Sequence, residues 1–368
     1  MKVPLLDLKP QYAQIKDQVV PELLSIFESQ GFILGPKVEK LEKEMAEYIG
    51  VKHTLGCSSG TDALLLALMA LDIKDGDEVI TTPYTFFATA GSIARTGAKA
   101  VFVDIDPATF LMNVNQIEEK ITSKTKAIIP VHLFGQCVDM EPLMAIAKKH
   151  NLAVIEDAAQ AIGAEYKGKQ AGTFGNVGCF SFFPSKNLGC FGDGGLVSTN
   201  CDKTYERMKG LRVHGGQVQY QHQEVGMNAR LDAIQAAVIS IKLPFLKSWT
   251  EGRRRNASIY NELFKDNKKV ITPKAKDNCY HIYNQYVIRV EGNRDALKAH
   301  LAEKEIGCSV YYPLSLHQQP CFKYLGYKTG DFPESEKAAA TSIALPIYPD
   351  LTKEQIEYVA ETINNYLK

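Results

Sequence analysis

The chain has 368 residues, enough for about two to three domains, and its 42 basic residues equal its 42 acidic residues. Proteins that bind nucleic acid usually carry a basic surplus or a basic stripe, so this balance argues against a nucleic-acid partner. With 45% hydrophobic and 23% charged residues, the composition is that of a globular protein and excludes a largely disordered chain.

Three further observations concern the cellular setting. No apolar run reaches the roughly 18 residues that a membrane-spanning helix needs. Residues 1–7 lack the charged and apolar regions of a signal peptide. The eight cysteines are scattered, with neither a CxxC pair nor the His/Cys spacing of a zinc site. We therefore expect a cytoplasmic protein with reduced thiols, no metal site and no membrane partner.

Strand-like and helix-like segments alternate between residues 50 and 200. Short apolar runs predict strands at residues 78–82, 100–104, 126–131 and 152–157, and amphipathic patterns predict helices at 86–95, 115–121 and 139–150. Apolar strands that alternate with helices indicate an α/β fold with a mostly parallel sheet that is covered on both faces. The ligand site of such a sheet is expected at the carboxyl ends of its strands.

The pattern changes after residue 200. Helices are predicted at residues 202–213, 231–243, 248–263, 294–304 and 353–366, with strands at 285–291 and 308–312. We expect a large domain over residues 1–245 and a smaller αβ domain over residues 246–368. The basic run at residues 253–255, near this junction, is typical of a solvated helix face.

Several common catalytic motifs are missing from the sequence. There is no GxxxxGK[ST] phosphate loop, no HExxH, and no GxGxxG between a strand and a helix. The glycine-rich stretch at residues 189–195 has the wrong spacing for a dinucleotide fingerprint. An ATPase or a nucleotide-dependent dehydrogenase is therefore unsupported.

Three other segments contain candidate binding or catalytic residues. Residues 57–62 place small hydrogen-bonding residues and a glycine at a helix start, which suits a phosphate or an ordinary helix cap. Asp157 ends an apolar strand, where an open α/β sheet places ligand-binding carboxylates or helix caps. Lys186 follows an aromatic run, and apolar surroundings can lower the pKa of a lysine until it becomes a nucleophile, although a lone lysine is usually a surface residue.

Taken together, these three segments match the needs of pyridoxal phosphate. This cofactor requires a lysine that binds it as a Schiff base, an acid that keeps its pyridine nitrogen protonated, and a cradle for its phosphate. Lys186, Asp157 and residues 57–62 supply one of each. Pyridoxal 5′-phosphate is therefore the predicted cofactor.

The same segments resemble the DegT/StrS family of pyridoxal-phosphate-dependent nucleotide-sugar aminotransferases. The resemblance extends over essentially the whole chain, and its matching segments are residues 4–8, 31–39, 59–64, 156–160, 181–186, 226–232 and 312–317. It implies the fold-type-I aminotransferase architecture, with a large mixed-sheet domain and a small C-terminal domain. It also implies a homodimer whose active sites are shared between subunits.

The resemblance also assigns roles to individual residues. Lys186 is the Schiff-base lysine, Asp157 the partner of the pyridine nitrogen, and Gln160 a contact to the 3′-oxygen of the cofactor. Phe86 stacks on the ring, and Asn228 reaches the phosphate from the neighbouring subunit. The complete set of implied cofactor contacts is Gly60, Thr61, Phe86, Asp157, Gln160, Ser181, Lys186 and Asn228.

The implied reaction is a transamination in two halves. L-Glutamate gives its amino group to the cofactor and leaves as 2-oxoglutarate, and a nucleotide-linked keto sugar then receives the group. Lys186 moves the proton in each half as general base and acid. Family members with a histidine at this position are sugar dehydratases, so Lys186 favours the aminotransferase. A regulatory or binding protein that keeps the fold without turnover is the alternative of another class.

The sugar is less closely defined by the sequence. The chain is most similar to members that act on C3 of UDP-linked 2-acetamido-3-oxo-glucuronate or dTDP-linked 3-keto-6-deoxyhexoses, and a 4-keto sugar is the alternative. Four residues are candidate substrate contacts on this resemblance: His214, Arg230, Tyr312 and His317. For each of them a purely structural role is the competing hypothesis.

Overall fold

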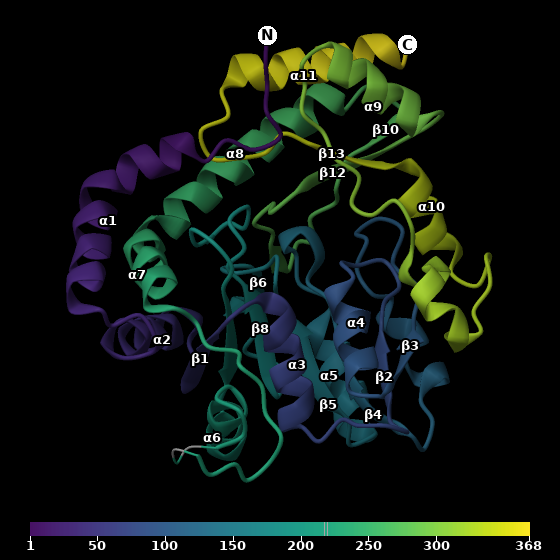
Figure 1. Cartoon of the computed structure of the whole chain (residues 1–368). Coiled ribbons are helices and arrows are strands. Elements are labelled where there is room, and N and C mark those ends of the chain that lie inside the picture. The colour runs from purple at the N-terminus through teal and green to yellow at the C-terminus, as the bar shows by residue number, and fades with distance from the viewer. Residues whose placement is uncertain (217, 219) are drawn as a thin grey trace.

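The computed structural model describes residues 1–216, 218 and 220–368, and its centre is a seven-stranded mixed sheet (Figure 1). The strand order is β1-β9-β8-β5-β4-β2-β3. The strands are β1 (His53–Cys57), β2 (Glu78–Thr81), β3 (Lys99–Phe102), β4 (Thr125–Ile128), β5 (Ala153–Asp157), β8 (Val177–Ser181) and β9 (Gly195–Thr199). Strand β9 runs antiparallel to its neighbours β1 and β8, and the remaining pairs are parallel. The sequence prediction of a mostly parallel sheet is confirmed.

Helices cover both faces of this sheet, which explains why its strands are nearly continuous apolar runs. One face carries α3 (Gly60–Ala70), α4 (Ala88–Arg95) and α6 (Asp202–Leu211), and the other carries α2 (Pro36–Ile49), α5 (Met140–Lys149) and α7 (Ala233–Lys242). Because successive strand residues point to opposite faces, Val79 packs in the first core and Ile80 in the second. The long helix α1 (Lys9–Ser29) lies against α7.

A second, three-stranded sheet lies at the end of the molecule where both termini are found (Figure 1). Its strands are β10 (Val270–Ile271), β12 (Tyr286–Val290) and β13 (Ser342–Leu345). The helices α8 (Leu246–Phe264), α9 (Arg294–Glu303) and α11 (Lys353–Tyr366) bury Tyr260, Leu297 and Ile363 against it. Val3 belongs to the same core and pairs with Ile306.

Shorter elements join these two parts. Strands β6 (Glu165–Tyr166), β7 (Lys169–Gln170) and β11 (Cys279–Tyr280) form a small third sheet. Helix α10 (Pro333–Thr341) precedes β13. The division expected at residue 245 falls in the short turn Leu243–Phe245 between α7 and α8, and the domain boundary stays a prediction. No helix in the described part of the chain is long and apolar enough to cross a membrane.

Three local expectations were wrong. The helix expected at residues 115–121 is replaced by two 3-10 turns, Val114–Gln116 and Glu118–Lys120; a segment this short gains too few hydrogen bonds to offset helix nucleation. The strand expected at residues 308–312 is limited to a single bridge between Ser309 and Ala344. Arg253 is buried rather than solvated, and its Nη1 donates to the carbonyls of Tyr283, Asn284 and Ile347.

Candidate active site

A cavity of about 600 Å³ lies at the carboxyl ends of β5 and β8, where an α/β sheet is expected to bind its ligand. It brings together residues that are far apart in the sequence. The expected site residues that line it are Gly60, Thr61, Phe86, Asp157, Gln160, Ser181, Lys186 and Tyr312.

The amino end of α3 forms one wall of this cavity. Ser59 caps the helix by accepting a hydrogen bond from the Asp62 backbone N–H at 3.1 Å, and Ser58 Oγ lies 2.5 Å from Asp62 Oδ2. A Cβ atom on Gly60 would come within 2.7 Å of the Ser181 Cβ, so glycine is needed for the loop to approach β8 this closely. The free N–H groups and the positive end of the helix dipole fit the phosphate of the expected cofactor.

Asp157 ends β5 inside the same cavity and is held by two donors. Thr89 on α4 donates its hydroxyl to Oδ2 at 2.8 Å, and the backbone N–H of Ala159 donates to Oδ1 at 3.2 Å. Burial raises the pKa of Asp157, and these hydrogen bonds oppose the rise. A buried carboxylate of this kind is stabilised by a cationic partner such as a protonated pyridine nitrogen.

Lys186 lies on the loop after β8 and lines the cavity with Asp157. Burial lowers the pKa of Lys186 to about 8, an effect that the charge of Asp157 partly offsets. The next residue fixes this loop, because Asn187 donates to the Ile282 carbonyl at 3.2 Å and accepts from Asn284 at 2.8 Å. A fixed amine with a lowered pKa is suited to attack a carbonyl carbon.

Gln160 and Phe86 face the remaining part of the cavity. Gln160 Oε1 accepts a hydrogen bond from the Phe134 N–H at 2.7 Å, and Nε2 donates to the Tyr312 hydroxyl at 3.1 Å. The Phe86 ring is 57% exposed, and its centroid lies 6.2 Å from that of Tyr312. Phe86 therefore retains free ring surface on which a flat cofactor can stack.

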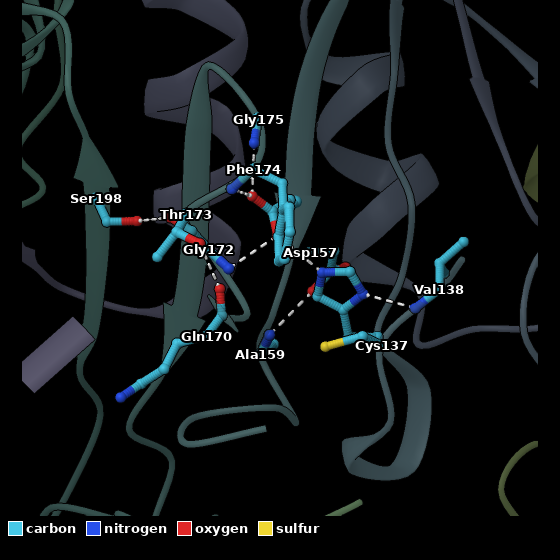
Figure 2. A network of polar contacts seen from close by, with 12 residues as sticks. Cys137, Val138, Asp157, Ala159, Gln170, Gly172, Thr173, Phe174, Gly175 and Ser198 are labelled. Atoms are coloured by element: carbon cyan, nitrogen blue, oxygen red, sulfur yellow. Dashed lines mark hydrogen bonds and ion pairs between the residues drawn. The ribbon is translucent and has the colours of Figure 1, made fainter. Parts of the chain in front are cut away.

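Glu156, next to Asp157, has a structural role (Figure 2). Its Oε1 accepts hydrogen bonds from the N–H groups of Phe174 and Gly175, both at 2.7 Å. Its Oε2 accepts from the N–H of Gly172 at 2.8 Å and lies 3.0 Å from His132 Nε2. Glu156 is fully buried and does not line the cavity. It fastens the loop between β7 and β8 to the strand that carries Asp157.

Four expected residues lie outside this cavity. His214 and Arg230 line a separate surface hollow of about 830 Å³, and Asn228 is exposed beyond the cavity lining. His317 is buried, with its Nε2 3.0 Å from Glu336 Oε1. Within a single chain, therefore, none of these four residues lines the cavity that contains Lys186.

The cavity is also lined by residues that were not singled out from the sequence, among them Ser59, Thr85, Phe183, Asp193, Gln285 and Tyr311. Two of them had a signal in the sequence: Ser59 lies within residues 57–62, the expected phosphate segment, and Tyr311 adjoins Tyr312. No motif marks Gln285, which comes from the segment before β12 and reaches the cavity only through the tertiary fold. Its Oε1 is buried and has no hydrogen-bond partner within the described residues.

The fold and this site define a pyridoxal-phosphate-dependent aminotransferase of fold type I, in which a lysine after the central strands faces a carboxylate and a phosphate cradle. The chain belongs to the DegT/DnrJ/EryC1/StrS aminotransferase family, whose family model matches residues 13–364. Both the sequence resemblance and the fold class expected from it are confirmed.

Comparison with individual proteins supports this assignment over the full length. The chain is 52% identical to a pleiotropic regulatory protein of Geobacillus stearothermophilus, with 100% of this chain and 99% of the relative covered. It is 43% identical to the UDP-N-acetyl-3-dehydro-alpha-D-glucosamine 3-aminotransferase of Acidithiobacillus ferrooxidans, with 99% and 98% covered. The crystal structure of NtdA from Bacillus subtilis with bound cofactor PMP matches with a TM-score of 0.91 at 30% identity, covering 100% of this chain and 85% of that chain. Other relatives, 36% to 41% identical, are named for 3-oxo or 3-amino sugars.

Proposed function

We propose that this protein transfers an amino group from L-glutamate to C3 of a nucleotide-linked 3-keto sugar, with pyridoxal 5′-phosphate as its cofactor. The observation that carries the proposal is that Lys186, Asp157 and the amino end of α3 line one cavity. The products are a nucleotide-linked amino sugar and 2-oxoglutarate.

Each part of the cavity has a distinct task. When bound, pyridoxal phosphate supplies a ring that withdraws electrons from the carbon that loses a proton. Lys186 holds the cofactor through its amine and, once the donor has displaced it, carries the proton between the donor's α-carbon and C4′. Asp157 keeps the pyridine nitrogen protonated. Gly60, Thr61 and Ser181 bind the phosphate.

Two further side chains orient the cofactor in this proposal. Phe86 stacks on the pyridine ring, and Gln160 donates a hydrogen bond to the 3′-oxygen. Both line the cavity together with Tyr312. In this proposal Tyr312 lies on the side of the cavity that receives the sugar. His317, by contrast, is buried and pairs with Glu336 outside the cavity lining, which suits support of its loop better than contact with the sugar.

We infer that the working unit is a homodimer with shared sites. Lys186 is the only cationic residue among the described residues that line the cavity, yet a nucleotide sugar brings a pyrophosphate, and a uronate adds a carboxylate. Arg230 has a buried Nε with no partner in the described part of the chain. Arg230, His214 and Asn228 of a second copy would supply the missing donors to the phosphate and the sugar.

Support for a 3-keto rather than a 4-keto substrate comes from the relatives, whose names place the oxo or amino group at C3. Those names include both UDP-linked and dTDP-linked sugars, so both nucleotides belong in a substrate screen. All eight cysteines are free thiols, and we place the enzyme in the cytoplasm, where such thiols stay reduced.

A non-catalytic regulator is the second candidate function, since one relative at 52% identity is named a pleiotropic regulatory protein. A regulator with this fold has no need of a lysine with a lowered pKa facing a buried carboxylate. The presence of both Lys186 and Asp157 therefore favours the enzyme.

The test is the visible absorption spectrum of the purified protein before and after addition of L-glutamate. We expect a yellow protein that glutamate bleaches, and a 3-keto sugar nucleotide that restores the colour, with Lys186→Ala as the control that forms no covalent cofactor adduct. A protein that takes up no added pyridoxal phosphate would favour the regulator. Colour restored only by 4-keto sugars would move the reaction to C4.

A further inference from the structure

The amide of Gln160 is oriented from both of its ends. The Phe134 N–H donates to Oε1 at 2.7 Å, which fixes the oxygen end of the side chain. The nitrogen end then faces the Tyr312 hydroxyl at 3.1 Å. An amide nitrogen carries two hydrogens, so one is used by Tyr312 and the other is left for a ligand in the cavity.

Tyr312 is itself held firmly in place. The hydroxyl of the fully buried Tyr84 donates to the Tyr311 carbonyl at 2.5 Å and lies 2.7 Å from Ser342 Oγ. The Tyr312 ring packs against Tyr84, with a centroid distance of 6.1 Å, and against Phe86 at 6.2 Å. Burial raises the pKa of Tyr312, so its hydroxyl remains protonated. The acceptor for the Gln160 amide therefore has a fixed position and a fixed charge.

We propose that Tyr312 is a positioning residue that acts through Gln160: its hydroxyl holds the amide so that the second N–H donates to the 3′-oxygen of the bound cofactor. This inference rests on the proposed function, which places the 3′-oxygen beside Gln160. The C-terminal part of the chain thereby contributes to the cofactor site of its own subunit, because residue 312 lies between α9 and α10.

The proposed hydrogen bond has a spectroscopic consequence. In the resting holoenzyme, the 3′-oxygen shares a proton with the nitrogen that joins the cofactor to Lys186. A hydrogen bond donated to the 3′-oxygen draws negative charge away from it and weakens its hold on that proton. A correctly held Gln160 thus lowers the pKa at which the visible band of the holoenzyme changes with pH, and a misplaced Gln160 raises it.

The experiment is a pH titration of the visible absorption of the holoenzyme and its variants. We expect Tyr312→Phe, which keeps the ring packing, to raise the apparent pKa by about 0.5 to 1 unit, the size of one net hydrogen bond. Gln160→Leu is expected to raise it at least as far, and adding Tyr312→Phe to Gln160→Leu to raise it no further. Tyr324→Phe is the matched control, since it removes a phenol that is 65% exposed and does not line the cavity.

Three results would overturn the inference. The first is an unchanged titration in Tyr312→Phe, and the second is an equal shift in Tyr324→Phe. The third is a Tyr312→Phe shift that persists in the Gln160→Leu background, which would mean that Tyr312 acts on the cofactor directly. Failure of the cofactor assignment on which this inference rests looks different, because the wild-type protein would then show no cofactor band at all.

Discussion

At the scale of single residues, the charged groups of the site depend on neighbours that no motif identifies. Thr89 donates to Asp157 Oδ2 at 2.8 Å, and burial already raises the pKa of Asp157. Removing the Thr89 hydroxyl raises the pKa of Asp157 further. The carboxylate then holds a proton more readily itself and is less able to keep the pyridine nitrogen protonated. We expect Thr89→Val to slow the half-reaction with L-glutamate by about 10- to 100-fold, the usual effect of a hydrogen bond to a charged group, measured as bleaching by stopped flow.

Thr85→Val is the matched control for that experiment. The Thr85 hydroxyl contacts Thr89 Oγ1 at 3.2 Å and does not reach the carboxylate, so its loss should slow bleaching much less. Equal bleaching rates in wild type and Thr89→Val would show that the Thr89 hydroxyl does not support the function of Asp157.

The pKa of Lys186 leads to a prediction about cofactor uptake. Burial lowers this pKa to about 8, and only the neutral amine attacks the aldehyde of pyridoxal phosphate. Protonation is favoured below the pKa, so the rate of uptake by the cofactor-free protein should rise with pH up to about 8 and level off above it. An ordinary lysine, with a pKa near 10.4, would instead keep gaining rate beyond pH 9. Mixing experiments that follow the visible band at several pH values distinguish these two profiles.

The residue scale also shows how far a sequence can specify a site. Lys186 and Asp157 could be named as site residues from the sequence, because each lies in a short contiguous segment whose residue types alone suggest a binding or catalytic role. Thr89 and Gln285 could not, since neither belongs to such a segment: Thr89 reaches Asp157, and Gln285 reaches the cavity, only after the sheet has formed. Glu156 lies within a recognisable segment, yet its side chain serves the neighbouring loop rather than the cofactor.

At the scale of secondary-structure elements, the carboxylate of Glu156 joins β5 to the loop before β8. It accepts hydrogen bonds from three backbone N–H groups, and its Oε2 lies 3.0 Å from His132 Nε2 (Figure 2). In Glu156→Gln, an NH₂ group replaces one of the accepting oxygens and faces N–H donors. We expect a loss of about 2 to 4 kcal/mol in the free energy of unfolding, because buried donors are left unsatisfied, measured by urea denaturation.

Glu141→Gln is a suitable control, because Glu141 is an exposed partner of Lys167 and surface ion pairs contribute little. Its urea midpoint should stay close to that of the wild type. A Glu156→Gln protein as stable as this control would contradict the structural role of Glu156.

Element boundaries were predicted best where periodicity was long and uninterrupted. The last helix was expected at residues 353–366 and forms as Lys353–Tyr366, with Thr352 and Gln355 completing a capping box. The basic run at residues 253–255 predicted a solvated helix face because charge alone indicates solvation. In the folded chain, Arg253 is buried, and its guanidinium donates hydrogen bonds to backbone carbonyls of residues 283, 284 and 347. These acceptors are distant in sequence, so the contacts could not be predicted from the run itself.

At the scale of the whole molecule, the chain exposes apolar surface that suits a second copy. Helix α1 presents Val20, Leu24 and Phe27 at 39%, 53% and 47% exposure, and Phe191 lies nearby, with its ring centroid 6.1 Å from that of Tyr12 on α1. Large exposed apolar side chains that gather on one face often mark an interface. This surface supports the homodimer inferred from the incomplete cavity. It was not identifiable from sequence, because Ile15, Val19 and Ile26 of the same helix are buried and apolar side chains alone do not indicate which face stays exposed.

A shared site can be tested by combining two inactive variants in one dimer. Lys186→Ala removes the lysine, and Asn228→Ala/Arg230→Ala removes the donors proposed to enter the other subunit's cavity. In a mixed dimer, one cavity combines the lysine of the second variant with the donors of the first and is complete. The other cavity lacks both contributions. Two different affinity tags allow the mixed dimer to be purified free of either homodimer.

We expect this mixed dimer to regain about half of the wild-type transamination rate per dimer, since one of its two sites is intact, while each homodimeric variant stays nearly inactive. The reason is geometric: Asn228 and Arg230 lie outside the lining of their own chain's cavity, and in the proposed dimer the partner's copies complete the site. If each subunit instead used its own Asn228 and Arg230, every cavity in the mixed dimer would lack one required group. A mixed dimer that is intact by sedimentation yet inactive would therefore show that the sites are not shared.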